Sequence, residues 1–364
     1  MKIYIGLVLL TLVGCQIPSR VALDGEGGRT AYNVAIQTTN SKQMLLNLVR
    51  LRYADSPLFL DVSSITTQTT FRTDVNPIIP IPGFSQQNPF RLGGDFLWED
   101  QPTITYVPLE GPAFATRLLR PIDLRTIQLL SYSGWDIDRI FRMMIQNFED
   151  LANCPENTAP APEQLSNYRL FVETSGLLRY FQRRGELQVG VKVKEAQEDS
   201  DEVSLQISFP QDGEQGGRLA KLIHSNRKLQ GKYVKEIQLG FDPDGRIGIM
   251  PRSILSCMYH LSQGVEVPQE HIDCGLIRLP VCNMGEEDLD WQMIFCELIS
   301  VHCCLHPPSS AFISVKYHDY WFYIDDCDLP SKRTFALLLQ LYNLNAIVPK
   351  NRGPILSLPL GLGG

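Results

Sequence analysis

The densest folding signal in the chain is the stretch Ala311–Asn345, AFISVKYHDYWFYIDDCDLPSKRTFALLLQLYNLN. Apolar residues alternate with polar ones on both sides of a tight turn at His318 and Asp319, which predicts two antiparallel strands. The alternating positions are Ile313, Val315 and Tyr317 before the turn, and Tyr320, Phe322 and Ile324 after it. Helical spacing follows, with an apolar stripe of Phe335, Leu338, Leu339 and Tyr342. The order strand, turn, strand and helix is typical of an α+β protein.

Three carboxylates stand between the second strand and the helix: Asp325, Asp326 and Asp328. They precede Pro330, so we favour a role in capping the helix, where carboxylates satisfy free amides and the helix dipole. The alternative is an acid–base or cation site, since carboxylates also serve those chemistries.

The N-terminus reads as a lipoprotein export signal over residues 1–14. Lys2 precedes an apolar run that is too short for a bilayer, which needs roughly 20 residues. The run ends in Leu-Val-Gly followed by Cys15, the pattern of a bacterial lipobox. We therefore expect cleavage before Cys15 and lipidation of its thiol. An ordinary signal peptide with a chance cysteine is the alternative.

The anchor and the charge indicate where the protein works. Gln16 rather than Asp follows the lipidated cysteine, which favours the outer membrane with the protein facing the periplasm. Residues 15–30 are predicted to be a flexible tether. Removing the leader takes away one of the 33 basic residues and none of the 40 acidic ones, so the net charge falls from −7 to −8. An acidic chain without a basic cluster argues against nucleic-acid binding.

We predict an N-terminal α+β domain over residues 31–152. It begins with a helix from Ser41 to Tyr53 and a strand at 58–62. The clearest helix is predicted over 137–148, with Asp136 as its N-cap. Its apolar positions follow helical spacing: Ile137, Ile140, Phe141, Met144, Ile145 and Phe148.

Three sequence blocks resemble a family of uncharacterised bacterial lipoproteins. The first is NLVRLRYADSPLFLDVSSI, the second runs from DQPTITY at Asp100 to LLRPI at Ile122, and the third is YWFYIDD with SKRTFALLL. Together they cover the mature chain from end to end. The resemblance implies an envelope lipoprotein and carries no assigned activity.

Residues 76–94 read as a loop rich in proline and glycine. The loop is unusually apolar for a solvated segment, which suggests either that it covers its own core or that it is a partner-binding surface. The residues of that possible partner surface are Ile78, Ile79, Ile81, Phe84 and Phe90.

A linker at residues 153–163 is predicted to separate the first domain from a C-terminal α+β domain at 164–364. After a helix at 165–183, two alternating strands, a helix near 218–229 and a strand near 237–241 predict a ββαβ unit. The stretch from Ala311 repeats that order, with a last strand expected at 355–358. A helix at 254–261 lies between the two units.

Nine cysteines include Cys15, and the eight others suggest disulfides in an exported protein. A zinc site is the weaker interpretation, because the candidate ligands lack a CxxC or HExxH spacing. Those candidates are His271, Cys274, Cys282, Cys303 and His306. We expect no metal and no cofactor, since the sequence contains no P-loop, no Rossmann fingerprint and no GxSxG motif.

These observations predict a lipid-anchored, non-enzymatic scaffold or binding subunit of an envelope assembly, with the membrane and another protein as partners. The alternative is an envelope hydrolase that uses Asp325, Asp326 and Asp328, or a Cys/His pair.

Overall fold

The structure is a computed structural model that describes residues 29–77, 92–154, 165–194, 202–241, 245–277, 295 and 297–345, without the side chains of residues 64–102. Helices alternate with antiparallel sheets, which confirms the α+β class. The described chain forms two compact units. The first unit holds residues 29–57 and 110–345, and the second holds residues 58–109.

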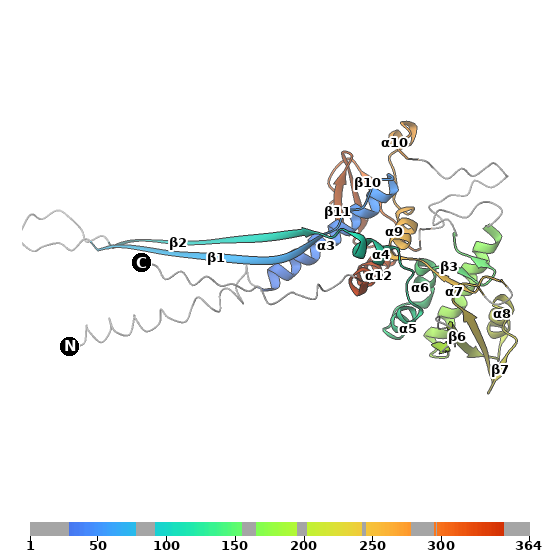
Figure 1. Ribbon diagram of the computed structural model, residues 1–364. Helices are drawn as coiled ribbons and strands as arrows, with labels where there is room; N and C mark the ends of the chain where they lie inside the picture. Colours follow the sequence, from blue (N-terminus) through green and yellow to red (C-terminus); the bar gives the residue numbers. More distant parts are fainter. Residues whose placement is uncertain are drawn as a thin grey trace, which may run out of the picture. The chain divides into compact units, whose positions relative to one another are not determined.

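The second unit is a long β-hairpin made by β1 (Leu60–Pro77) and β2 (Leu92–Pro108). The antiparallel register runs from Leu60 opposite Pro108 to Pro77 opposite Leu92, with an irregularity between Val62 and Ser64. Figure 1 shows the two strands side by side. The predicted strand at 58–62 is therefore the start of a much longer one. The possible partner surface at Ile78, Ile79, Ile81, Phe84 and Phe90 lies outside the described residues.

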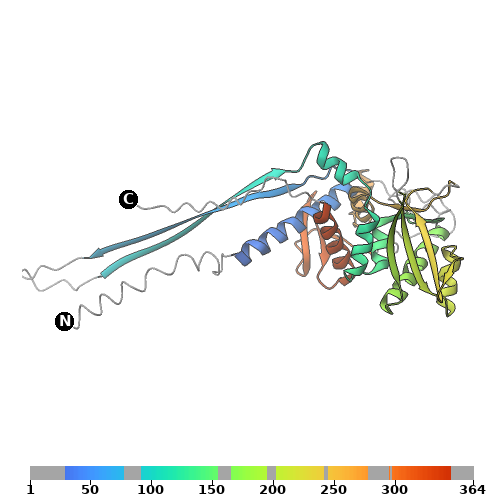
Figure 2. The ribbon, with the colours of Figure 1, turned by 60° about the horizontal axis from the view of Figure 1, so that its bottom comes forward.

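In the first unit, the predicted sequence of strand, turn, strand and helix is confirmed. The sheet has the order β10 (His302–Cys304), β12 (Tyr320–Asp325), β11 (Ala311–Tyr317), and α12 (Leu329–Asn345) follows it. His318 and Asp319 have φ of +43° and +67°, as a tight two-residue hairpin turn requires. In Figure 2 the helix α12 lies against this sheet. The inward positions of α12 include Phe335, Leu337, Leu338 and Leu341, whereas Leu339 and Tyr342 are only half-buried.

Helices connect this sheet with the rest of the unit. The helix α3 (Arg29–Arg52) begins before its predicted start at Ser41 and contacts β11 and α9 (Ile254–Ser262). Its buried residues lie in its second half and include Met44, Leu45, Leu48 and Val49. The short helix α4 (Pro112–Leu119) also contacts α9. The helix α10 (Gln269–Asp273) follows α9 in the chain. The predicted helix at 254–261 is thus confirmed and is a central contact of the unit.

The predicted helix at 137–148 is wrong in its second half. The helix α6 (Ile137–Met144) ends and β3 (Ile145–Phe148) continues the chain, between β4 (Leu151–Ala152) and β9 (Ile249–Pro251). All six apolar positions of the predicted stripe are buried, but the last two are buried in a sheet. The chain leaves the helix where Asn153 and Arg252 supply donors to its final carbonyl groups.

The predicted domain boundary at 153–163 is not where the structure divides. The strands β3 and β9 pair across it, and α6 packs on α7 (Leu165–Arg183) from the other side. The strand pairing and the helix packing together place the residues before and after this segment in one compact unit. A linker-like composition therefore does not mark a boundary between cores here.

The first predicted ββαβ unit is present, with one short additional strand, as a four-stranded sheet. Its order is β5 (Gln188–Lys194), β6 (Glu202–Pro210), β8 (Lys232–Gln238) and β7 (Lys228–Leu229). The predicted helix at 218–229 is wrong in its second half, because α8 (Glu214–Leu222) starts four residues earlier and ends seven residues earlier, and residues 228–229 form β7. The helix α5 (Leu124–Tyr132) contacts β5. The expected strand at 355–358 lies outside the described residues.

None of the helices in the described part of the chain is long and apolar enough to cross a membrane.

Candidate functional site

An open groove of about 600 Å³ lies between α12 and the turn that joins α5 to α6. We call it the α12 groove. Its walls are residues 133–136 of the turn, Phe312 at the start of β11, and four residues of α12: Lys332, Arg333, Ala336 and Gln340. The turn needs Gly134, whose φ of +91° is a conformation that favours glycine. The groove is therefore assembled from segments that are far apart in the sequence.

Two aromatic side chains line the α12 groove. The indole Nε1 of Trp135 donates a hydrogen bond to Oε1 of Gln340 at 2.9 Å, which fixes the ring against α12. Phe312 is 43 % exposed, and the Lys332 ammonium lies 4.9 Å from the centroid of its ring. Such a distance gives a favourable cation–π interaction. The aromatic surface is thus held in place before any partner arrives.

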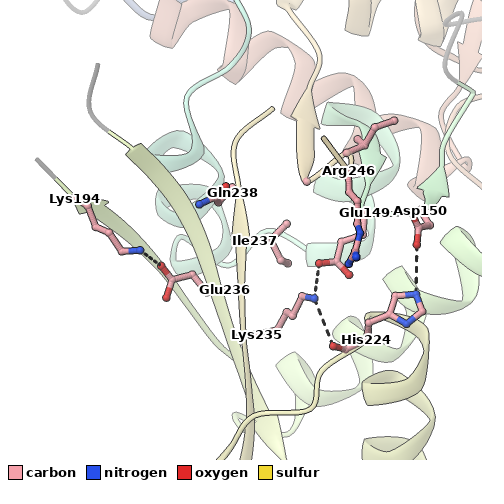
Figure 3. A pocket seen from close by; sticks show the side chains of 11 residues that line it. Glu149, Asp150, Lys194, His224, Lys235, Glu236, Ile237, Gln238 and Arg246 are labelled. Carbon is pink, nitrogen blue, oxygen red and sulfur yellow. Dashed lines mark hydrogen bonds and ion pairs between the residues drawn. The ribbon is translucent and has the colours of Figure 1, made fainter. Parts of the chain in front are cut away.

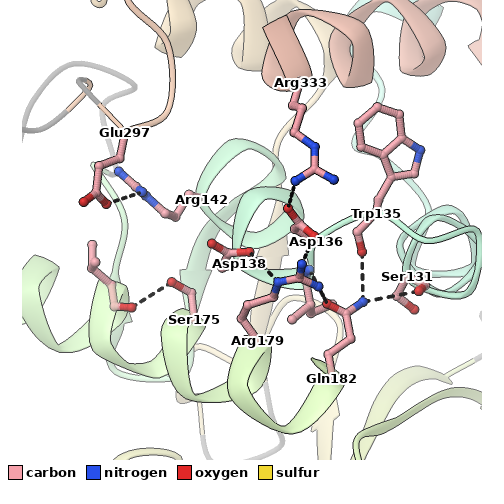
Figure 4. A network of polar contacts seen from close by, with 12 residues as sticks. Ser131, Trp135, Asp136, Asp138, Arg142, Ser175, Arg179, Gln182, Glu297 and Arg333 are labelled. Carbon is pink, nitrogen blue, oxygen red and sulfur yellow. Dashed lines mark hydrogen bonds and ion pairs between the residues drawn. The ribbon is translucent and has the colours of Figure 1, made fainter. Parts of the chain in front are cut away.

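Asp136 organises the charged wall of the α12 groove (Figure 4). The Asp136 side chain is only 11 % exposed, and its carboxylate accepts a 2.9 Å hydrogen bond from Nη1 of Arg333 and forms an ion pair with Arg179 of α7. Buried carboxylates are tolerated when they are paired and hydrogen-bonded. Asp136 thereby sets the position of Arg333, whose side chain is 49 % exposed.

Gln182 of α7 carries out the capping that the sequence assigned to Asp136. Its Oε1 accepts from the backbone N–H of Ile137 at 2.9 Å, and its Nε2 donates to the carbonyl oxygen of Trp135 at 2.8 Å (Figure 4). Asp136 does occupy the N-cap position, but its side chain makes no capping bond. The N-cap prediction was therefore right about position and wrong about the bond, because the two arginines hold the carboxylate.

The carboxylates at 325–328 serve local structure. Asp328 accepts from the Ser331 amide at 3.1 Å and so caps α12, which confirms the favoured interpretation. Asp325 accepts from the Cys327 amide at 2.8 Å, and Asp326 pairs with Lys332 at 2.6 Å. Each carboxylate has its own partners, so the three do not converge on a common point.

The described cysteines are free thiols: Cys154, Cys257, Cys274, Cys303, Cys304 and Cys327. Burial raises the pKa of Cys154 and of Cys257 to about 12, and that of Cys303 to about 11. A thiol that stays protonated at neutral pH is a poor nucleophile. Cys15, Cys282 and Cys296 lie outside the described residues, so lipidation and the expected disulfide stay predictions.

The candidate zinc ligands named from the sequence do not gather in the described part of the structure. Nδ1 of His271 is 2.7 Å from the Tyr53 hydroxyl, and Cys304 Sγ donates to the carbonyl of His306. Among the residues described, no three His, Cys, Asp or Glu side chains form a group that could hold a metal ion. Cys282 is outside that description.

Sequence reasoning missed the α12 groove. One signal was available: Trp135 follows Ser133 and Gly134 in a polar turn between two helices, where a large aromatic residue is uncommon. No local pattern could place Phe312 and Arg333 beside it, because each lies on a different element.

No family model matches the chain, and no curated protein or solved structure matches it either.

Proposed function

We propose that this chain is a lipid-anchored envelope protein and a non-enzymatic binding subunit of a periplasm-facing assembly, which holds a protein partner in the α12 groove. The observation that carries the proposal is the composition of the groove, with Trp135, Phe312 and Arg333 on one concave surface. Aromatic residues and arginine are enriched at the energetic centres of protein interfaces, whereas lysine, aspartate and glutamate are depleted there.

The partner's chemistry follows from the groove. Nη1 of Arg333 is engaged by Asp136, and about half of the side chain remains open to solvent. A guanidinium carries five donors, so its outer edge can bind a carboxylate of the partner. The two rings offer room for an apolar side chain next to that carboxylate. We infer an extended protein segment with an acidic and an apolar residue close together.

The location rests on the N-terminal residues. The lipobox that ends at Cys15 and the Gln16 after it support an anchor in the outer membrane, facing the periplasm. An acylated N-terminus gains about 0.8 kcal/mol for each buried methylene group, and two or more chains hold a protein stably. Labelling with a fatty-acid analogue should mark the wild type and not Cys15→Ala; equal labelling of both contradicts the anchor.

The hydrolase alternative draws no support from the geometry. Asp325, Asp326 and Asp328 are each engaged by nearby groups, and none of the three lines the α12 groove. The high pKa values of the buried thiols oppose a Cys/His nucleophile as well.

Site-specific photocrosslinking in the envelope tests the proposal. A photoreactive residue at Ala336, which is exposed within the groove, should capture a discrete protein. The same residue at Lys221, exposed on α8, serves as the control. We expect Arg333→Gln and Phe312→Ala to weaken capture at 336, because both residues are surface-exposed and their loss leaves the core intact. Capture of the same protein from both positions, or capture unaffected by both variants, overturns the assignment of the groove.

A further inference from the structure

A second cavity, of about 380 Å³, shares no residue with the α12 groove. It lies where the β3–β4 turn meets β8, the connection between α8 and β7, and the segment that leads into β9. The residues that matter for its chemistry are Glu149, Asp150, His224, Lys235, Glu236 and Arg246. Figure 3 shows these side chains around the opening.

The floor of the cavity is an ion pair. Nζ of Lys235 lies 2.6 Å from Oε1 of Glu149, and the two side chains are only 19 % and 16 % exposed. Burial raises the pKa of Glu149, although the nearby Lys235 acts to lower it. A pair so poorly solvated presents strong, fixed partial charges to whatever enters, because the local dielectric is low.

The rim carries further charges of both signs. Nε2 of His224 is 3.5 Å from Oδ2 of Asp150, and Lys194 is 3.7 Å from Glu236 (Figure 3). Arg246 stands above the floor pair in the same view. With histidine neutral, the lining carboxylates number three and the lining Lys and Arg side chains number three.

The backbone around the cavity is held in conformations that need support. Glu149 and His224 have φ of +52° and +48°, in the left-handed region that such residues rarely adopt. The Glu149 amide donates to the Gly248 carbonyl at 2.6 Å, and a side chain at Gly248 would lie 2.1 Å from the Gln238 carbonyl oxygen. The fold thus fixes the positions of Glu149 and His224.

We propose that this cavity binds a small zwitterion, a molecule with a primary ammonium and a carboxylate or phosphate a few bonds apart. A ligand of one sign would be repelled by half of the lining charges, whereas a zwitterion meets an opposite charge at each end. Its anionic group is placed at Lys235 and Arg246, and its ammonium at Asp150 and Glu149. Ile237 and Ile247 also line the cavity and provide an apolar wall for a short side chain.

Two sources supply that chemistry, a free amino acid or short peptide and the headgroup of an ethanolamine phospholipid. Titration calorimetry on the full chain in detergent distinguishes them. The probes are the dipeptide alanyl-alanine and glycerophosphoethanolamine. N-acetyl-alanine and alanine amide serve as matched ligands with a single charge. We expect one or both zwitterions to bind, and each single-charge ligand to bind at least about tenfold more weakly.

Rim variants complete the test. Arg246→Gln and Asp150→Asn remove one charge each from exposed positions and leave the floor pair intact, so both should fold and bind the zwitterion at least about tenfold more weakly. Arg218→Gln, which breaks an exposed ion pair with Glu173 outside the cavity, should bind like the wild type. The proposal is overturned if neither zwitterion binds at millimolar concentration, if a single-charge ligand binds equally well, or if both rim variants bind like the wild type.

Discussion

Replacing Arg252 with methionine should destabilise the first unit more than any surface change. The Arg252 side chain is 1 % exposed, and its guanidinium donates to five backbone carbonyl groups around the end of α6 and the chain after β4. Those carbonyls belong to Arg142, Met143, Ile145, Asn153 and Cys154. Methionine fills a similar volume without any of these donors.

The size of the effect follows from which carbonyls keep a donor. Nδ2 of Asn153 also donates to the carbonyls of Arg142 and Ile145, and Sγ of Cys257 donates to that of Met143. The carbonyls of Asn153 and Cys154 are the ones that depend most on Arg252. Two buried acceptors left unsatisfied cost about 1–3 kcal/mol each. Methionine avoids the desolvation cost of a buried guanidinium, which offsets part of that loss. We expect a loss of about 3 kcal/mol.

Thermal unfolding followed by circular dichroism measures this loss. A decrease of about 3 kcal/mol corresponds to roughly 6–10 °C in a unit of this size. Arg125→Met, at an exposed position on α5, is the matched control and should change stability by less than about 0.5 kcal/mol. If Arg252→Met unfolds at the wild-type temperature or above it, the guanidinium is not what holds the end of α6.

Three smaller predictions concern a cap, a titrating pair and a close backbone contact. Asp328→Ala should cost about 0.5–2 kcal/mol in chemical denaturation, while Asp328→Asn should be mild because asparagine also caps; equal losses would refute capping. The hydrogen bond with Glu266 raises the pKa of His302, so its stabilisation is complete below the unfolded value of about 6.5 and is lost as pH rises through the folded pKa. Unfolding across pH 5–9 (roughly the range in which histidine titrates) should show that fall in the wild type and not in His302→Gln; identical profiles contradict it. Gly248→Ala should lower the melting temperature, since its Cβ would stand 2.1 Å from the Gln238 carbonyl oxygen, and an unchanged temperature would show that the backbone can move aside.

The sequence predicted the elements whose signals are local. The strands on either side of His318 and Asp319, the cap at Asp328 and the alternating strands β5 and β6 all follow from spacing within a few residues. Local signals failed where a distant residue decides the outcome. The apolar stripe from Ile137 to Phe148 fits a helix, but donors from Arg252 and pairing with β9 end that helix at Met144.

The site was harder to predict than the fold for the same reason. The α12 groove needs Trp135, Phe312 and Arg333, which belong to three elements separated by many residues. Asp136 looks like a helix cap in sequence and becomes the anchor of Arg333 only when α7 and α12 meet at it. The three prolines within residues 153–163 predicted a boundary, yet packing of α6 on α7 spans it.

The most direct test of the account measures how tightly the partner captured at position 336 binds the purified chain. We predict that Arg333→Gln weakens binding by roughly 10- to 100-fold, the value of a lost charge-assisted hydrogen bond, and that Trp135→Ala and Phe312→Ala weaken it as well. Lys221→Gln should bind like the wild type. An affinity that none of the three groove variants changes would contradict the claim that the α12 groove is the binding site.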